Sequence, residues 1–245
     1  MHEFIDLHNH SLFGVDDGAT TLEMSKNMLE IAYQDGIKAI CFTPHFKPNH
    51  FSSNNSIEAY NKRILYAFEI ICAYAKEKYP DMRLILGNEI MFHNDMCDSL
   101  ALGNCRTIGK SKYVLVEFKP ETSEYEMKSI IYKLLRRGFK PIIAHIERYS
   151  AFLHDLELIQ EFKSMGAILQ INAYSIVKFR FGKIAKLIKF AFKNDLVDIV
   201  CTDAHNDSVA LPNLSKAFTR IANKFGFECA SRIFYKNPQK ILINI

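Results

Sequence analysis

The stretch FIDLHNHSLFGVDDGA, residues 4–19, changes from an apolar segment to a loop rich in titratable side chains. Residues 4–8 are typical of a buried strand, and the loop that follows adds His10, Asp16 and Asp17. Taken alone, the loop has an ordinary explanation, because two aspartates before a glycine are common in turns and a single His-x-His is weak evidence for ligation. Its meaning therefore depends on what the other strands place beside it.

Six further short apolar runs, rich in β-branched residues, follow the first one, and segments with helical periodicity separate them. The predicted strands are 4–8, 39–44, 83–89, 113–118, 141–145, 168–173 and 197–204; the clearest predicted helices are 20–36, 56–80 and 123–138. This alternation indicates parallel strands joined by helices. No linker, repeat or low-complexity tract interrupts it. The sequence thus predicts one α/β domain over residues 1–245, a distorted (β/α)7 barrel of the TIM type with one unit fewer than eight.

Composition narrows the possible partners. The chain has 245 residues, 49% hydrophobic content and a net charge of +4, which is enough chain for a substantial core and too little charge to favour nucleic acid. The N-terminus lacks the order of a signal peptide, and no apolar run reaches the roughly 18 residues of a membrane span. We therefore expect a cytoplasmic protein with neither nucleic-acid binding nor membrane insertion.

The six cysteines show neither a Cys-x-x-Cys pair nor a Cys-x5-Arg phosphatase loop. Scattered cysteines of this kind indicate reduced thiols, not a disulfide framework. Thiolate chemistry of the cysteine-phosphatase type is not expected.

Titratable residues recur where the predicted strands end. In a (β/α) barrel the C-terminal ends of the strands share one rim, so these side chains should meet there. They are His8, His10, Asp16, Asp17, His45, Glu89, Glu117, His145, Asp203 and His205. Five histidines and several carboxylates are too many for one acid and base pair, and mixed imidazole and carboxylate donors suit manganese, iron or zinc better than calcium or magnesium. Each residue alone could be a surface or turn residue, but their joint placement predicts a multinuclear metal site.

The charge of such a site would attract an anion. Three divalent ions against the carboxylates of Asp17, Glu89, Glu117 and Asp203 leave a local charge of about +2, which suits a phosphate dianion. Arg148, three residues past His145, could bind that phosphate with its planar fork; the alternative is a salt bridge to Glu147 or another acid.

Two weaker features lie nearby in the sequence. Lys47 and His50, on the loop after His45, are weaker candidates for substrate contact. The basic run 178–189 is typical of a solvated helix face.

The motifs of the chain resemble those of the polymerase and histidinol phosphatase (PHP) superfamily of metal-dependent phosphoesterases. The resemblance lies in DLHNH at the start, TPH after the second strand, AH at the end of the fifth and DAH at the end of the seventh. Within the superfamily, GVDDGA, GNEI, YVLVEF and HIERY resemble the bacterial manganese-dependent tyrosine-phosphatase branch linked to capsule and exopolysaccharide synthesis. The resemblance extends from residue 4 to about residue 206.

The resemblance implies a trinuclear site, with manganese as the expected metal and iron or zinc as alternatives. It assigns the first ion to His8, His10, Glu89 and Asp203, the second to Glu89, Glu117 and His145, and the third to Asp17, His45 and His205. Two positions depart from the branch. Phe46 stands where members often have a second histidine, and Ala210 stands near a position where they often have an arginine.

The implied activity is hydrolysis of phosphomonoesters by a hydroxide held between metal ions. The expected substrate is a phosphotyrosine-bearing protein, a bacterial tyrosine kinase of the capsule or exopolysaccharide type. Tyrosine is a good leaving group because its pKa is about 10. The residues expected to act in catalysis are Arg148, His45 and Asp203.

Three alternatives stay open at the level of the sequence. The first is a small-molecule phosphatase, for example one acting on histidinol phosphate. The second, an exonuclease associated with a polymerase, is disfavoured by the mild charge and by the lack of a polymerase domain in the sequence. The third is a catalytically weak, metal-stabilised binding module.

Overall fold

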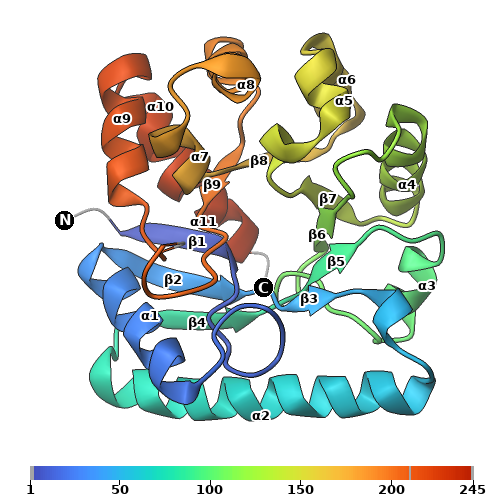
Figure 1. The fold of residues 1–245 in the computed structure, drawn as a ribbon, viewed down its shortest axis with the longest axis vertical. Coiled ribbons are helices and arrows are strands. Elements are labelled where there is room, and N and C mark those ends of the chain that lie inside the picture. Colours follow the sequence, from blue (N-terminus) through green and yellow to red (C-terminus); the bar gives the residue numbers. More distant parts are fainter. Residues whose placement is uncertain (1–2, 210, 244–245) are drawn as a thin grey trace.

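The computed structural model describes residues 3–209 and 211–243, and there short parallel strands alternate with helices. The strands are β1 (Phe4–Asn9), β2 (Ile37–Phe42), β3 (His45–Phe46), β4 (Arg83–Leu86), β5 (Glu89–Met91), β6 (Tyr113–Glu117), β7 (Lys140–Ile143), β8 (Ile168–Asn172) and β9 (Ile199–Cys201). One sheet has the order β1-β2-β4 and the other the order β3-β5-β6-β7-β8-β9. Together they curl into a distorted barrel (Figure 1), which confirms the predicted fold class.

The barrel closes between its first and last strands. Asn9, at the end of β1, forms a parallel bridge with Ala204, just after β9. The backbone N–H of Asp203 donates to the carbonyl oxygen of His8 at 2.9 Å, and that of His10 donates to Ala204 at 3.0 Å. Closure therefore joins the DLHNH and DAH motifs, which lie at opposite ends of the sequence.

Two predicted strands are broken, so the expectation that each would be continuous was wrong. Segment 39–44 is strand only as far as Phe42, the end of β2, and β3 begins after it at His45; segment 83–89 breaks at Gly87 and Asn88, between β4 and β5. Pro44 has no N–H to donate to a ladder and restricts the residue before it. Asn88 fixes the neighbouring break, because its Nδ2 donates to the carbonyl oxygen of Pro44 at 2.8 Å. The two paired breaks split the barrel into its two sheets.

The helices cover the strands, and side-chain caps mark the beginnings of α1, α2 and α4. They are α1 (Leu22–Gln34), α2 (Asn54–Lys78), α3 (Met96–Ala101), α4 (Glu124–Arg136), α5 (Ser150–His154), α6 (Glu157–Met165), α7 (Ala173–Lys178), α8 (Gly182–Lys193), α9 (Ser215–Phe225), α10 (Phe227–Ser231) and α11 (Asn237–Leu242), with 3-10 turns at Pro48–His50 and Ile146–Arg148 and a π-helical turn at Arg232–Lys236. Thr21 caps α1 and Ser123 caps α4, each by accepting a backbone N–H of the first turn. All three predicted helices are confirmed. Within residues 3–209 and 211–243, none of these helices is long and apolar enough to span a membrane.

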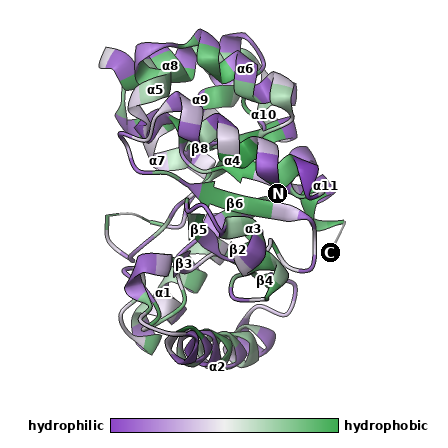
Figure 2. Cartoon of the chain, turned by 90° about the vertical axis from the view of Figure 1, so that its right-hand side faces the viewer, coloured by the Kyte–Doolittle hydropathy of each residue, from purple (hydrophilic) through white to green (hydrophobic). Residues whose placement is uncertain are grey.

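Apolar side chains cover both faces of the strands. In β6, Val114 and Val116 belong to the cluster that includes the surrounding helices, whereas Tyr113 and Leu115 belong to a second cluster on the opposite face. Figure 2 shows β6 as largely hydrophobic, while α2 carries many hydrophilic residues. Strands buried on both faces appear in the sequence as continuous apolar runs, which explains why these strands could be recognised. Glu117 continues the alternation of Tyr113 and Leu115, so its carboxylate lies on their face, at the rim.

The loop after β1 depends on a glycine. The backbone N–H of Ala19 donates to the carbonyl oxygen of His10 at 3.0 Å, which brings Gly18 against the backbone of His10. A Cβ on Gly18 would lie 2.0 Å from that carbonyl oxygen and 2.6 Å from the Cβ of His10. No side chain at this position can avoid the backbone unless the loop moves.

We expect Gly18→Ala to lower the free energy of unfolding by about 3 kcal/mol, because an overpacked backbone contact must be relieved by displacing the loop. Urea denaturation would measure it. The control is Gly138→Ala, where φ is 81° but an added Cβ meets nothing within 4 Å. That change should cost about 1 kcal/mol, from backbone conformation alone. Equal losses in the two variants would contradict the close approach at His10.

Candidate metal centre

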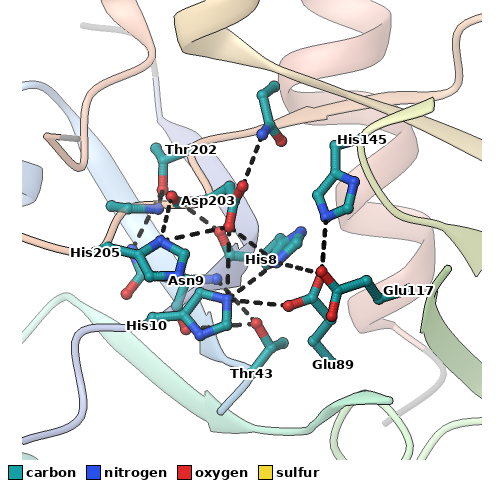
Figure 3. A network of polar contacts seen from close by, with 12 residues as sticks. His8, Asn9, His10, Thr43, Glu89, Glu117, His145, Thr202, Asp203 and His205 are labelled. Atoms are coloured by element: carbon teal, nitrogen blue, oxygen red, sulfur yellow. Dashed lines mark hydrogen bonds and ion pairs between the residues drawn. The ribbon is translucent and has the colours of Figure 1, made fainter. Parts of the chain in front are cut away.

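The rim of the barrel brings together all nine residues predicted as metal ligands. They come from β1, from the first residues of β3 and β5, from the end of β6 and from the segments after β1, β7 and β9: His8, His10, Asp17, His45, Glu89, Glu117, His145, Asp203 and His205. His45 and Glu89 begin β3 and β5 and pair in parallel register, so the two strand breaks place them side by side. Figure 3 shows the imidazole and carboxylate groups pointing toward one another.

A first group of donors gathers around His8. Its Nε2 lies 3.1 Å from Nε2 of His10, 3.3 Å from Oδ1 of Asp203 and 3.2 Å from Oε1 of Glu89. Ligands held about 2.1 Å from one metal ion are separated by about 3–3.4 Å, so these spacings suit a shared cation. His8 and His10 are both buried, and their Nε2 atoms are only 3.1 Å apart. This close approach is also expected if both nitrogens coordinate one cation.

A second group surrounds two carboxylates, those of Glu89 and Glu117. Nε2 of His145 lies 3.0 Å from Oε1 of Glu89 and 3.8 Å from Oε1 of Glu117, and Nδ1 of His45 lies 2.9 Å from Oε2 of Glu89. Oε2 of Glu89 and Oε2 of Glu117 are buried and accept no hydrogen bond of normal geometry. A buried carboxylate oxygen whose neighbouring imidazole nitrogens are poorly aligned for hydrogen bonding is costly, and coordination of a cation would compensate this cost.

The third group lies at the outer edge of the site. Oδ1 of Asp17 is 3.2 Å from Nε2 of His45 and 3.6 Å from Nε2 of His205, and His10 completes this group of potential ligands. The side chain of Asp17 is 62% exposed, in contrast to the buried first group. Asp17, His45 and His205, the predicted ligands of the third ion, thus lie together. His10 is a fourth potential ligand in this group.

Charges within the site shift the pKa values in opposite directions. Burial raises the pKa of Glu89, but His8, His10, His145 and His45 surround its carboxylate and bring the pKa well below its usual range. Burial and the charge of Glu89 raise the pKa of Glu117. Burial alone would lower the pKa of His45, but contacts with Asp17 and Glu89 raise it to about 9. Protonated imidazoles therefore balance the carboxylates, and a bound cation would displace these protons.

Polar residues behind the predicted ligands hold them in place, and two of these, Gln170 and Asn172, were not identified from the sequence as part of the site. Gln170 Oε1 accepts the backbone N–H of His145 at 2.8 Å and lies 3.2 Å from Nδ1 of His8. Asp16, interpreted from the sequence as a turn residue as much as a ligand, lies 2.8 Å from Nδ1 of His10 through its Oδ2 and accepts the backbone N–H of His45. Partners of this kind fix the tautomer and orientation of ligating histidines. The segment ILQINA could have identified Gln170 and Asn172, because these two residues alternate with apolar residues in a predicted strand. They therefore share one face of that strand, and both are buried.

Arg148 lies at the edge of the first group. Its Nη2 is 2.7 Å from Oδ2 of Asp203, and Asn172 Nδ2 donates to the same oxygen at 2.7 Å. The salt bridge considered from the sequence is thus formed with Asp203, whereas Glu147 accepts the backbone N–H of Asn172. The side chain of Arg148 is half exposed and lines a cleft of about 340 Å³. Because guanidinium has five donors, the ion pair and a phosphate contact are compatible, and the latter stays a prediction.

The backbone is strained at two of the predicted ligands. His145 and Asp203 have φ values of 30° and 53°, and Asp195 is the third non-glycine residue with positive φ among residues 3–209 and 211–243. Such conformations cost energy and are often found at functional sites. Here they turn the side chains of His145 and Asp203 toward the shared rim.

Most of the remaining residues singled out from the sequence lie in the core, in a cleft or on a helix. Phe46 is buried and packs against Phe51, with 5.3 Å between the ring centroids, so it belongs to the core. Lys47 and His50 line a second cleft beside Asp17 and His45. The basic run 178–189 spans the end of α7 and much of α8, whose apolar face is buried. Ala210 lies outside the described residues.

Comparison with known proteins agrees with the resemblance inferred from the motifs. The family described as "Capsular polysaccharide synthesis, CpsB/CapC" matches residues 4–243. The chain is 32% identical over 245 residues to the tyrosine-protein phosphatase CpsB of Streptococcus agalactiae serotype V, and 33% identical over 245 residues to that of Streptococcus pneumoniae, covering 98% of each chain in both cases. Its fold is also similar to a structure from a study of YwqE from Bacillus subtilis and CpsB from Streptococcus pneumoniae, described as metal-dependent tyrosine phosphatases. That match has a TM-score of 0.86 at 24% identity and covers 98% of this chain and 94% of the other.

The family match spans nearly all of the chain, and the relatives align with it over almost their whole length. Together with the rim of histidines and carboxylates, this shows that the chain belongs to the CpsB/CapC family of capsular polysaccharide synthesis.

Proposed function

We propose that this protein is a metal-dependent protein-tyrosine phosphatase, with residues 1–245 forming one catalytic domain. The observation that carries the proposal is the convergence of three donor groups on one rim, with buried carboxylate oxygens that lack hydrogen bonds and with Arg148 at the edge. The similarity to curated tyrosine-protein phosphatases supports the choice of substrate. The expected substrate is a phosphotyrosine-bearing bacterial tyrosine kinase of capsule synthesis.

The donor groups would hold three divalent ions, with manganese as the first candidate and iron or zinc as alternatives. His8, His10, Glu89 and Asp203 would hold one ion, Glu89, Glu117 and His145 the second, and Asp17, His45 and His205 the third. Metal ions at such a site supply a water activated at neutral pH and neutralise the charge of the phosphoryl group. The free thiols of the chain are typical of a reducing compartment, so a cytoplasmic location belongs to the proposal.

The side chains themselves would orient the ester and stabilise its charge. Asn172 and Arg148 hold Oδ2 of Asp203, which leaves Oδ1 directed toward His8 and His10. The remaining N–H groups of Arg148 would donate to phosphoryl oxygens as charge accumulates on them during in-line displacement. A phenolate leaving group, with a pKa of about 10, needs little help from a general acid.

Metal removal tests the proposal directly. Chelator-stripped protein should lose hydrolysis of a phosphotyrosine peptide and regain it with manganese, with close to three ions bound per chain. Asp203→Asn should bind fewer ions and lose at least about a hundredfold in kcat/KM, because a neutral amide replaces the carboxylate that would hold the first ion. Asparagine tolerates positive φ, so this change leaves the backbone at Asp203 acceptable.

The matched control is Asp195→Asn, since Asp195 also has positive φ, at 57°, but lies on the surface paired with Arg232. It should keep full metal content and activity. Full ion content without turnover of any phosphoester in the unmodified protein would favour a binding module instead, and turnover of histidinol phosphate alone would favour a small-molecule phosphatase.

Arg148→Lys tests the phosphate contact. The lysine keeps the charge but loses the planar fork, so we expect kcat/KM for a phosphotyrosine peptide to fall by about tenfold to a hundredfold. Ion content should stay unchanged, as measured by elemental analysis of the same samples. Arg232→Lys, in an exposed pair with Asp195, is the control and should match the unmodified protein. Normal turnover by Arg148→Lys would contradict the assigned contact.

Alkylation tests the absence of thiolate chemistry. Burial raises the pKa of Cys41 and Cys201 above the usual range and that of Cys105 to about 12, so these thiols stay protonated. Iodoacetamide treatment of the folded protein should leave activity unchanged and label at most the partly exposed Cys72 and Cys229, as read by mass spectrometry. Loss of activity in step with labelling would argue for a cysteine nucleophile.

A further inference from the structure

A cleft of about 330 Å³ opens beside the outer donor group. Its walls come from three places in the chain: the loop after β1, the segment after β3 and the first half of α2. Asp17 and His45 form its inner end, Phe51 and Tyr60 form an aromatic wall, and Lys47, His50 and Arg63 supply basic groups. Nothing in the proposed metal site or in the contact with Arg148 uses these basic groups.

The aromatic wall is rigidly held. The rings of Phe51 and Tyr60 lie 5.3 Å apart, and Phe51 also packs against Phe46 at 5.3 Å. The Tyr60 hydroxyl donates to the carbonyl oxygen of His45, which ties the wall to the metal centre. The cleft is therefore part of the packed fold and continues directly from the site where a phosphoryl group would bind.

The acids of the cleft already have partners. Asp16 contacts the ring of His10 and the backbone N–H groups of His45 and Gly18. Asp17 contacts the rings of His45 and His205. Of the two carboxylates, only that of Asp17 also approaches a basic group of the cleft, with its Oδ2 3.9 Å from Nζ of Lys47.

The cations of the cleft, in contrast, have little to balance them. Nζ of Lys47 has only a distant ion pair, 3.9 Å from Oδ2 of Asp17. Arg63 is exposed, and in the part of the chain that the structure describes no carboxylate lies within ion-pair distance of it; its guanidinium lies 5.5 Å from the centre of the Tyr60 ring. Two unbalanced cations in a hollow with an apolar wall favour an anionic group on a short carbon stem.

A second cleft, beside Arg148, has a different character. Its lining combines apolar groups of Tyr174, Val177 and Leu211 with the polar residues Asn172, Asn213 and Lys216. The metal centre thus has one exit with a larger apolar share and one with several basic groups, and a peptide that crosses the rim would place different side chains in each.

We propose that the cleft between the segment after β3 and α2 binds an acidic side chain of the substrate close to its phosphotyrosine, with Arg63 and Lys47 as the groups that contact it. This inference rests on the proposed phosphatase activity and adds a sequence preference to it. Because both cations are partly exposed, the preference should be modest and sensitive to salt.

The test compares two phosphotyrosine peptides that differ only in glutamate or glutamine at the positions flanking the phosphotyrosine. For the manganese-loaded full chain we expect kcat/KM to be about threefold to tenfold higher for the glutamate peptide. A rise in salt from about 50 mM to about 500 mM should bring the ratio close to one, because the screening length falls from more than about 10 Å to roughly 4 Å.

Substitutions then assign the preference to the cleft. Arg63→Gln should lower the ratio, and Arg63→Glu should bring it to one or below, because a like charge repels the glutamate peptide. Lys62→Gln is the matched control on the same helix, since Lys62 lies outside the cleft and pairs with Glu58. It should keep the ratio of the unmodified chain. Circular dichroism would confirm that each variant is folded.

The outcomes separate this inference from the proposed function. Equal hydrolysis of the two peptides at low salt would overturn the acidic preference and leave the phosphatase activity standing. A preference that survives in both Arg63 variants would also overturn it. Hydrolysis of neither peptide by fully metal-loaded protein would overturn the phosphatase proposal and this inference with it.

Discussion

The carboxylate of Glu89 is fully buried and stabilised by four imidazole rings, and the rest of the site is arranged around it. An ionised carboxylate in a protein interior is stable only when cations or hydrogen-bond donors surround it. His8 and His10 reach it from the first strand, and His45 and His145 reach it from two other segments. Much of the barrel therefore serves to bring these rings to one point, and the same arrangement explains the opposite pKa shifts of Glu89 and Glu117.

Polar residues behind the donors fix their direction. Gln170 contacts both His8 and His145, Asp16 contacts His10, and Asn172 holds Asp203. The backbone contributes as well, because closure of the barrel at Asn9 and Ala204 joins the first and last motifs, and positive φ turns Asp203 toward the rim. Rigid support of this kind keeps functional groups in position without a reorganisation cost at each reaction cycle.

In the proposed phosphatase the two clefts beside the centre would divide the tasks of recognition. Arg148 lines the cleft with the larger apolar share, whereas Lys47 and Arg63 line the other. A site that uses metal ions and arginine for the phosphoryl group would gain selectivity among peptides only from contacts outside that group. The basic groups beside Asp17 would be such contacts, and their exposure sets the limit on how much they can contribute.

The order of the main strands and helices could be predicted from the sequence, because most strands are short, largely apolar runs and the helix caps at Thr21 and Ser123 are local signals. The sequence also pointed to the nine candidate ligands, because strand ends in a parallel barrel share one rim. The breaks at Pro44 and Asn88, the pairing of Arg148 with Asp203 and the support from Gln170 could be learned only from the folded chain. These features depend on contacts between residues far apart in the chain, and neither periodicity nor local propensity records which distant side chain will satisfy a buried polar group.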